Sequence, residues 1–312
     1  QKGAVFDWQF FQNPDRGTLR TFLVGEVVAG HIVALNGLMP VRIRYQGEPS
    51  LACWSCDTFV SPEQRGRGFG TQLVREVTKA APVMLGYGIS DMSDPIFHKH
   101  DWVQPPGVSL LFFHVDEPGM KGHFKNWMSR FARLRKLRIA PRECEIASSL
   151  TPQLAGELDE LWQRSAPGYF SAVERDATYL RWKYFEHPLH RYYGYGLRRH
   201  GALAAFLIAR PDPVESVIVD YCGPANDVGA MIDLAAATLR DLVDRGTLRV
   251  RCETTHVPLI EALRRVGFVM SRHASRFRVH ASVGTADPLK GWLLMAGDSD
   301  GDVLGSFTRE AS

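Results

Sequence analysis

Long hydrophobic runs are missing from this sequence, which argues against a helical membrane protein. The longest strongly apolar run, residues 202–209, is short, whereas a helix that crosses a bilayer needs about 20 apolar residues. The start of the chain shows no signal-peptide pattern. Instead, a helix-like stretch begins almost at Gln1, which is not a methionine. We therefore expect a cytoplasmic protein without a transmembrane segment, whose first domain begins upstream of Gln1.

Cysteine is scarce, and its placement excludes a disulfide-rich secreted domain. The five cysteines are an odd number at scattered positions, so a disulfide framework is not expected and a reducing compartment fits. Cys53 and Cys56 form a single CxxC pair inside a strand-like apolar stretch, and no second pair follows. A structural zinc site normally needs four such ligands. The sequence thus predicts no metal site.

The chain also has little excess charge of either sign, because 37 Lys and Arg are nearly balanced by 34 Asp and Glu, which leaves a net charge of +3. A nucleic-acid-binding protein usually shows a concentrated basic face. With 45% hydrophobic and 23% charged residues, the composition is that of an ordinary globular protein. We therefore expect no nucleic-acid partner.

The chain contains an internal repeat. Its 312 residues exceed what one hydrophobic core usually organises. Phe6–Pro14 resembles Leu180–Pro188, with Trp, Phe and Pro at the same places, and each segment ends a helix ahead of a proline. Residues 55–60 correspond in the same way to residues 217–221. The sequence pattern in both halves then predicts the same order of elements: helix, strands, helix, strand, helix, strand.

The repeat sets the expected domain boundaries. We expect a first domain over residues 1–120, a linker over 121–142 and a second domain over 143–312. The linker holds eight Lys or Arg and no acid, interleaved with apolar residues at helical spacing. It predicts an interdomain helix, and a surface for an anionic substrate or anionic lipid is the alternative. Since an internal repeat can make the contact that a homodimer makes, we expect a monomer.

The segment that carries chemistry is Asp57–Val74. An apolar strand runs into a glycine-rich turn and then directly into an amphipathic helix. Glycines let the backbone approach a phosphate closely, and the first amides of a helix point at an anion. The segment lacks the Lys-Ser/Thr of a P-loop and the glycine spacing of a dinucleotide fold. It predicts a pyrophosphate-binding site of another class.

This unit resembles the GNAT acyltransferase superfamily. Gln64–Gly70 matches the signature Arg/Gln-x-x-Gly-x-Gly/Ala, and Val60–Pro62 supplies the Val-x-Pro that precedes it. Residues 83–89 are similar to the next strand, and Ile96–Trp102 to the end of the next helix. The resemblance covers roughly residues 20–115. It implies an α/β fold of two tandem GNAT-like domains, each a splayed mixed β-sheet flanked by helices.

The resemblance also implies the co-substrate, acetyl-CoA or another acyl-CoA. Backbone groups of Phe59 and Val60 would pair with pantetheine, while amides of the turn would hold the pyrophosphate. The cofactor-binding residues of the turn and first helical residues are then Gln64, Arg65, Gly66, Arg67, Gly68, Phe69, Gly70 and Thr71.

Transfer in this superfamily is generally direct attack of an amine on the thioester, which calls for a base and an acid. The resemblance makes Asp57 the base, although an Asp bonded to a turn at the strand end is the alternative. The acid tyrosine of the family falls on Phe97, which has no proton to give. His98 or His100 would have to replace it, unless both are surface histidines of a helix.

The second copy has lost the cradle, since residues 225–230 contain neither the glycine signature nor a basic residue. We expect it to bind no coenzyme A and to serve as the wall for the acceptor. Its polar candidates are Tyr169, Asp220, Tyr221 and Glu253.

One competent and one degenerate copy resemble a bacterial group of polysaccharide-associated acyltransferases. The implied function is an N-acyltransferase, most simply an acetyltransferase, acting on a small-molecule amine such as an amino sugar or its nucleotide. The alternatives are a non-catalytic acyl-CoA-sensing or scaffold protein and a Fem-type aminoacyl-tRNA-dependent transferase.

Overall fold

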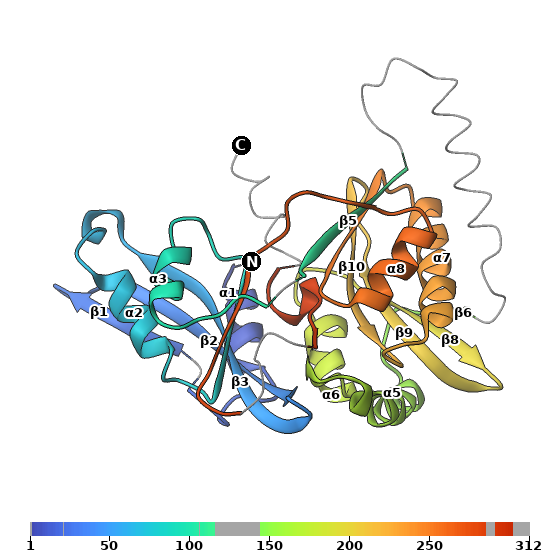
Figure 1. Ribbon diagram of the computed structural model, residues 1–312, viewed down its shortest axis with the longest axis horizontal. Coiled ribbons are helices and arrows are strands. Elements are labelled where there is room, and N and C mark those ends of the chain that lie inside the picture. The colour runs from blue at the N-terminus through green and yellow to red at the C-terminus, as the bar shows by residue number, and fades with distance from the viewer. Residues whose placement is uncertain (1, 21, 106, 116–143, 285–290, 302–312) are drawn as a thin grey trace, which may run out of the picture.

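The computed structural model describes residues 2–20, 22–105, 107–115, 144–284 and 291–301. The basic segment 121–142 lies outside these ranges, so the linker helix and the division of the chain near residue 142 stay predictions. The described chain forms two mixed sheets that lie side by side, each with helices packed on it (Figure 1). The predicted α/β architecture of two splayed mixed sheets is confirmed.

The first sheet is built mainly from the first half of the chain. Its strand order is β13-β4-β3-β2-β7-β14, with β1 also paired to β2. The bounds are β1 Phe22–Val28, β2 His31–Tyr45, β3 Glu48–Val60, β4 Val83–Tyr87, β7 Ser171–Val173, β13 Phe277–Ala281 and β14 Trp292–Leu293. The helices of this half are α1 Lys2–Phe6, the π-helical turn η1 Asp7–Phe11, the 3₁₀ turn η2 Pro62–Gln64, α2 Phe69–Val77 and α3 Asp94–Lys99.

The second sheet has the order β12-β5-β11-β10-β9-β8-β6. Its strands are β5 Ser109–His114, β6 Cys144–Ala147, β8 Tyr193–Arg199, β9 Ala202–Arg210, β10 Glu215–Cys222, β11 Arg249–Thr254 and β12 Val269–Met270. Its helices are α5 Pro152–Ser165, η3 Ala166–Gly168, α6 Ala177–Leu180, η4 Arg181–Phe185, α7 Val228–Asp244, α8 Val257–Arg265 and η5 Ala296–Asp298.

The helices form where capping residues and a helical spacing of apolar residues favour them. Thr151 caps α5 by accepting a hydrogen bond from the backbone N–H of Leu154, and Pro152 occupies the first turn, where no N–H is needed. The apolar face of α5 that the sequence predicts, with Leu158 and Trp162, is buried in the core. Helix α5 therefore covers the second sheet as its sequence pattern requires.

The two copies exchange their last strands. β5, from the first half, pairs antiparallel with β11 of the second sheet, and β13, from the second half, pairs antiparallel with β4 of the first sheet. In Figure 1 the teal β5 accordingly lies among the yellow and orange strands. Each sheet is thus completed by the other copy, so the copies cannot separate without breaking two strand ladders. Nothing in the sequence pattern predicts this exchange.

A pair of tryptophans marks the pseudo-symmetry axis. Trp8 and Trp182 stack with ring centroids 5.0 Å apart. Trp8 Nε1 donates to the carbonyl of Trp182 at 2.8 Å, and Trp182 Nε1 donates to the carbonyl of Trp8 at 3.0 Å. Reciprocal contacts of this kind arise when equivalent patches meet across a two-fold axis. The two helix ends that the repeat predicts as equivalent therefore pack against each other.

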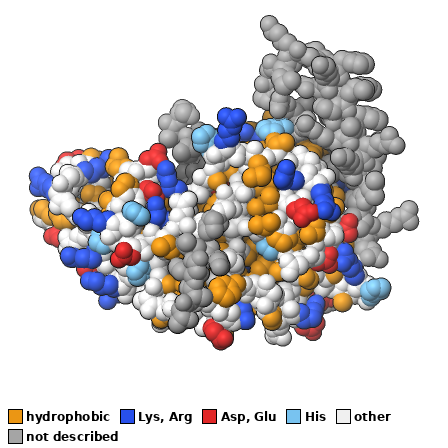
Figure 2. Space-filling view, viewed as in Figure 1, with side chains coloured by type: hydrophobic (Ala, Val, Ile, Leu, Met, Phe, Trp, Pro, Cys, Tyr) orange, Lys and Arg blue, Asp and Glu red, His pale blue; other side chains and the backbone are white. Residues whose placement is uncertain are grey.

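The surface carries both signs of charge. On the face shown in Figure 2, Lys and Arg side chains are interspersed with Asp and Glu side chains over the lobe at the left, which holds the first sheet. Among the helices that the structure describes, none combines the length and apolar character needed to cross a membrane.

Candidate functional site

The first sheet parts between β3 and β4. These parallel strands pair over residues 52–55 and 83–86, ending at Ser55 and Gly86. β3 then continues to Val60 while β4 ends at Tyr87. Within the described chain no pairing between β3 and β4 is seen beyond Ser55 and Gly86, so the rest of β3 has no strand partner on this edge. This parting of the strands is the splay that the resemblance to the GNAT superfamily implies.

A β-bulge sits at the mouth of this gap. The pairing of β3 with β2 shifts register between Cys56 and Phe59, and Asp57 adopts φ +51°. Left-handed backbone is uncommon for residues other than glycine, and Asp and Asn tolerate it best. The buried side chain of Asn36 holds the bulge by donating to Thr58 Oγ1 at 2.5 Å and to the carbonyl of Cys56 at 3.3 Å. The bulge turns Asp57 out of the strand's regular alternation.

Asp57 combines access to solvent with a perturbed acidity. Its side chain is exposed, and yet partial burial by the surrounding chain raises the pKa of its carboxyl above the ordinary value. A raised pKa makes a carboxylate a stronger base. The geometry thus permits the predicted role of Asp57 as a proton acceptor, which remains a prediction.

The glycine-rich turn has the backbone that the predicted cradle requires. η2 leads into the turn, where Gly66 and Gly68 have φ +78° and +87°, and α2 starts at Phe69. The first amides of α2 have no partner within the helix and point out of its N-terminus. A Cβ built on Gly66 or Gly68 would meet no atom within 4 Å, so the space above the turn is open. Open space above free helical amides is what the predicted pyrophosphate site requires, and the site itself remains a prediction.

The side chains around the cradle have separate roles. Arg65 Nε donates to the carbonyl of Val60 at 3.3 Å, which ties the turn to the end of β3. Arg65 and Arg67 are exposed and lend positive charge to the turn. Phe59 is 45% exposed, which is unusual for a Phe on a strand and is consistent with a surface that a ligand covers.

Phe97, where the family's acid tyrosine is expected, points into the protein. Its ring is 5% exposed and belongs to a hydrophobic cluster with Leu38, Val74 and Met84. It meets the ring of Trp102 edge-on at 4.9 Å. Phe97 is therefore a core residue of α3, and a hydroxyl at this position would enter the cluster.

We expect Phe97→Tyr to lower the free energy of unfolding by about 1–3 kcal/mol, because its hydroxyl would be buried without a partner. Turnover per folded molecule should not fall, since no acid is removed. Urea unfolding measures the first quantity, and Phe11→Tyr, at a position that is 49% exposed, is the control. Unchanged stability with Phe97→Tyr would show that the hydroxyl reaches solvent or a partner.

The two candidate histidines do not share one environment. His98 is exposed on α3 and lines a cavity of about 490 Å³ with Trp102 and Arg278. Arg278 belongs to β13, the edge strand beyond β4. His100 ends α3 and is half-buried. The structure thus places His98 beside the outer edge of the sheet. Among the described residues, no contact joins either histidine to Asp57.

Tyr87 is a residue to which the sequence alone gives little weight. It is the first residue of β4 beyond the paired part of the gap. Burial, and after it the nearby carboxylate of Glu253, raises the pKa of Tyr87 well above its ordinary value. Tyr87 therefore stays protonated at neutral pH and can donate a hydrogen bond. The feature that distinguishes Tyr87 is its place just beyond the paired residues of β4, and only the register of strand pairing reveals that place.

The second copy fills its own cradle with a carboxylate. Asp227 is the N-cap of α7 and accepts the N–H of Ala230 at 2.9 Å. Its other oxygen accepts Arg199 Nη1 at 2.7 Å. Asp227 thus occupies the helix terminus that corresponds to Gly68 in the first copy. An anionic ligand would meet a fixed negative charge there, which supports the prediction that this copy binds no coenzyme A.

The four acceptor residues predicted from the sequence fall in different places. Tyr169 lines a cavity of about 430 Å³, and Tyr221 is buried next to it, stacked on His256 with ring centroids 6.3 Å apart. Glu253 is buried near the end of β4, where it accepts the N–H of Ser275 at 2.5 Å. Tyr169 therefore lines this cavity, whereas Tyr221 and Glu253 are buried.

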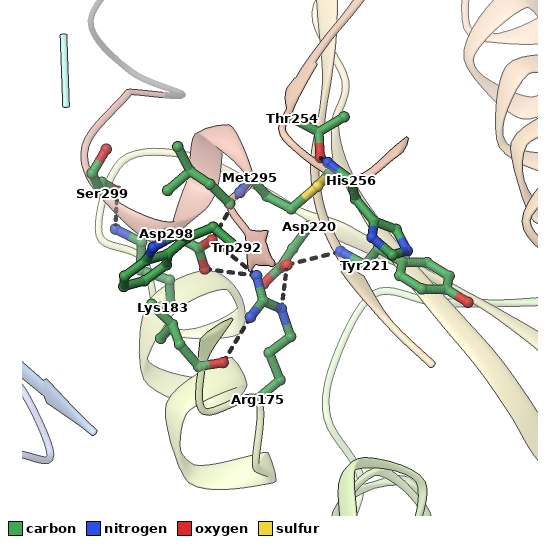
Figure 3. Close-up of polar contacts among 12 residues, drawn as sticks. Arg175, Lys183, Asp220, Tyr221, Thr254, His256, Trp292, Met295, Asp298 and Ser299 are labelled. Atoms are coloured by element: carbon green, nitrogen blue, oxygen red, sulfur yellow. Dashed lines mark hydrogen bonds and ion pairs between the residues drawn. The ribbon is translucent and has the colours of Figure 1, made fainter. Parts of the chain in front are cut away.

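Asp220 is enclosed in an ion cluster (Figure 3). Arg175, which is fully buried, lies between two carboxylates: its Nε donates to Asp220 at 2.8 Å and its Nη2 to Asp298 at 2.8 Å. Tyr184 donates its hydroxyl to Asp220 at 2.8 Å. Lys183 holds the carbonyl of Ser299 at 2.5 Å. The cluster anchors η5 and the segment up to Ser299, and Asp220 has no surface to offer an acceptor.

The cluster predicts a pH dependence of stability. Burial raises the pKa of Asp298 to about 7, so the folded state binds this proton more tightly than the unfolded state does. The contribution of Asp298 to stability is then largest at low pH and falls as the pH rises from about 4 to about 7, by at most about 1.4 kcal/mol per pH unit. Urea unfolding of wild type and Asp298→Asn at several pH values measures it. We expect the difference, wild type minus variant, to fall over this window, and a constant difference would contradict the raised pKa.

The described residues show no metal centre, because no group of three or more His, Cys, Asp or Glu among them lies close enough to hold a metal ion. Cys53 and Cys56 are both free and buried. Burial raises the pKa of both thiols far above the ordinary value, which disfavours the thiolate that a metal requires.

Comparison with known proteins agrees with this geometry. No protein-family model and no curated protein matches the sequence. Among solved structures, the chain is similar to an N-myristoyltransferase of Saccharomyces cerevisiae with bound myristoyl-CoA, at 11% identity and a TM-score of 0.59, covering 90% of this chain and 76% of that one. It is also similar to a GCN5-related N-acetyltransferase of Anabaena variabilis, at 12% identity and a TM-score of 0.54, covering 81% of this chain and 60% of that one.

A GCN5-related N-acetyltransferase of Kribbella flavida matches at 16% identity and a TM-score of 0.52, over 81% of this chain. The chain spans 58% and 60% of the length of the two GCN5-related proteins. These likenesses show the fold. The chain has the GNAT N-acyltransferase fold in a tandem arrangement of two mixed sheets, like that of N-myristoyltransferase.

Proposed function

We propose that this protein is an acyl-CoA-dependent N-acyltransferase, which moves an acyl group, most simply acetyl, from coenzyme A to an amine of a small molecule. The observation that carries the proposal is the parted pair β3 and β4 beside an open glycine cradle at the start of α2. The gap offers unpaired backbone to a pantetheine arm, and the cradle offers amides to a pyrophosphate. The bound myristoyl-CoA of the yeast relative supports the same ligand class.

In the proposed reaction the amine nitrogen attacks the thioester carbon, a C–N bond forms, and the C–S bond breaks. Asp57 accepts the amine proton, directly or through one water. The sulfur leaves as a thiolate, and because a free thiol has a pKa near 8.5, it needs little help from an acid. This fits a chain in which Phe97 is a core residue. The bulge supports the role of Asp57, because it fixes the direction of that side chain.

The acceptor in this proposal is a small amine, such as an amino sugar or sugar nucleotide, held against the second copy. The cavity beside Tyr169 supports a ligand on that side of the molecule. Turnover over a panel of acyl-CoAs and amines, measured as release of coenzyme A thiol, would identify the acyl length and the acceptor.

A second candidate is an acyl-CoA-sensing protein without transfer, which the buried Phe97 favours because the family's usual acid is missing. Titration calorimetry with acetyl-CoA and thiol release separate the two functions. Binding together with amine-dependent thiol release supports the transferase. Binding without release for any amine supports the sensor, and no binding contradicts both.

A further inference from the structure

The gap between β3 and β4 has an open end and a closed end. The open end faces the glycine-rich turn, because β3 leads through Val60 into that turn. At the closed end the strands are paired, and Ser55 and Gly86 are the last pair. A pantetheine arm that starts at the turn and follows β3 passes Val60 and then Phe59, so its acyl group points toward the closed end. The acyl group would therefore meet the residues that lie there.

Two buried side chains lie at the closed end on one face of the sheet. One residue beyond the last pair are Cys56 on β3 and Tyr87 on β4, and each is 8% exposed. Both belong to the large hydrophobic cluster that also contains Leu85. Cys56 is held from below, because Gln9 Nε2 donates to its Sγ at 3.2 Å. The bulkiest group at this end of the gap is therefore the ring of Tyr87.

The ring of Tyr87 has little freedom to move aside. A Cβ built on Gly301 would overlap with this ring, so the backbone of Gly301 lies directly against it. Gly301 is buried, and it follows Ser299, whose carbonyl accepts Lys183 Nζ at 2.5 Å. Tyr87 is also paired with Phe277 of the neighbouring strand β13. Segments of the second half of the chain thus fix the ring, and a ligand could displace it only by moving them.

Ile89 lies at the closed end on the other face of the sheet. A Cβ built on Gly86 would meet Ile89 Cδ1 at 3.1 Å and Trp102 Cζ3 at 3.5 Å. Successive positions of a strand point to opposite faces, so these two side chains cover Gly86 on the side away from Tyr87. Ile89 is half-buried and packs against the cluster of Phe97. The closed end is thus packed on both faces.

We propose that Tyr87 and Ile89 restrict the co-substrate to short acyl groups, from acetyl to butyryl. A longer chain would have to displace packed side chains, and overfilling a packed interior is unfavourable. Tyr87 and Ile89 are then residues that determine specificity and take no part in proton transfer. The inference rests on the proposed function, because it specifies the acyl group at the same site.

The test is the affinity of the wild-type protein for acyl-CoAs of increasing length, without an acceptor. Titration calorimetry is run with acetyl-CoA, butyryl-CoA and octanoyl-CoA. We expect the first two to bind within about 3-fold of each other and octanoyl-CoA to bind at least about 10-fold more weakly than acetyl-CoA. Tyr87→Ala removes the ring and should bring octanoyl-CoA to within about 3-fold of acetyl-CoA.

Three further variants keep the test specific. Tyr87→Phe keeps the ring and removes only the hydroxyl, so it should retain the wild-type ratio of the two affinities. Tyr87→Ala also removes a buried ring from the core, and Ile89→Ala, at a half-buried position, is the milder substitution. Ile89→Ala should also strengthen octanoyl-CoA relative to acetyl-CoA. Ile146→Ala, at a position of β6 that is 50% exposed, should leave the ratio unchanged.

The possible failures are distinguishable. Octanoyl-CoA bound by the wild type as tightly as acetyl-CoA would overturn the inference and leave the proposed co-substrate in place. An unchanged ratio of the two affinities in both Tyr87→Ala and Ile89→Ala would do the same. If no acyl-CoA of any length bound, the proposed function and the inference would both be wrong.

Discussion

We expect Gly68→Asp to abolish coenzyme A binding while the protein stays folded. The substitution places a carboxylate at the N-cap of α2, where the pyrophosphate is expected. Asp is a favoured N-cap residue, and its side chain can accept the first free amides of the helix. It also tolerates the left-handed backbone that Gly68 adopts. The variant would therefore reproduce what Asp227 does at α7 in the second copy.

The matched control is Gly68→Asn, which has the same shape and the same tolerance for positive φ but no charge. We expect Asp to weaken acetyl-CoA binding by at least about 10²-fold and Asn to weaken it less, since like charges repel across the cradle. Titration calorimetry measures both, with circular dichroism to show that α2 and the fold persist. Equal acetyl-CoA affinity of wild type and Gly68→Asp would show that the pyrophosphate does not bind at this turn.

We expect Asp57→Asn to lower turnover by on the order of 10²-fold or more, the usual scale of a general base, and to leave acetyl-CoA affinity unchanged. Asn keeps the shape of Asp and is equally tolerated at φ +51°, so the bulge at Asp57 should persist. Only the ability to take a proton is lost. The rise of wild-type kcat/KM with pH, which reports deprotonation of the base, should disappear in the variant.

Asp101→Asn is the control for this experiment, because Asp101 is also exposed and also has a positive φ, +61°. It should keep full turnover. If Asp57→Asn kept full turnover with its true acceptor, Asp57 would be only a turn residue, and the base would have to be sought elsewhere in the chain.

The sequence predicts the backbone of the glycine-rich turn from local rules, whereas the parting of β3 and β4 beside it is implied by the resemblance to the GNAT superfamily. Glycines at Gly66 and Gly68 are needed for left-handed backbone next to a helix start, and this pattern is visible in a single stretch of residues. The repeat is visible for the same reason, since Trp8 and Trp182 occupy equivalent helix ends. Local signals of this kind do not depend on how distant strands pair.

The environment of the polar side chains depends on distant contacts. Asp220 is equivalent to Asp57 by sequence position, but Arg175 and Asp298, the latter far along the chain, enclose it in an ion cluster. The exchange of β5 and β13 also joins segments distant in sequence.

A crystal structure of the protein soaked with coenzyme A tests the central claim most directly. We predict one molecule per chain, with its pyrophosphate over the amides of Arg65–Thr71 and its pantetheine arm between β3 and β4, beside Phe59 and Val60. The N-terminus of α7 should hold none, since Asp227 is already there. Coenzyme A bound at α7, or bound at the surface with an empty gap between β3 and β4, would contradict the claim.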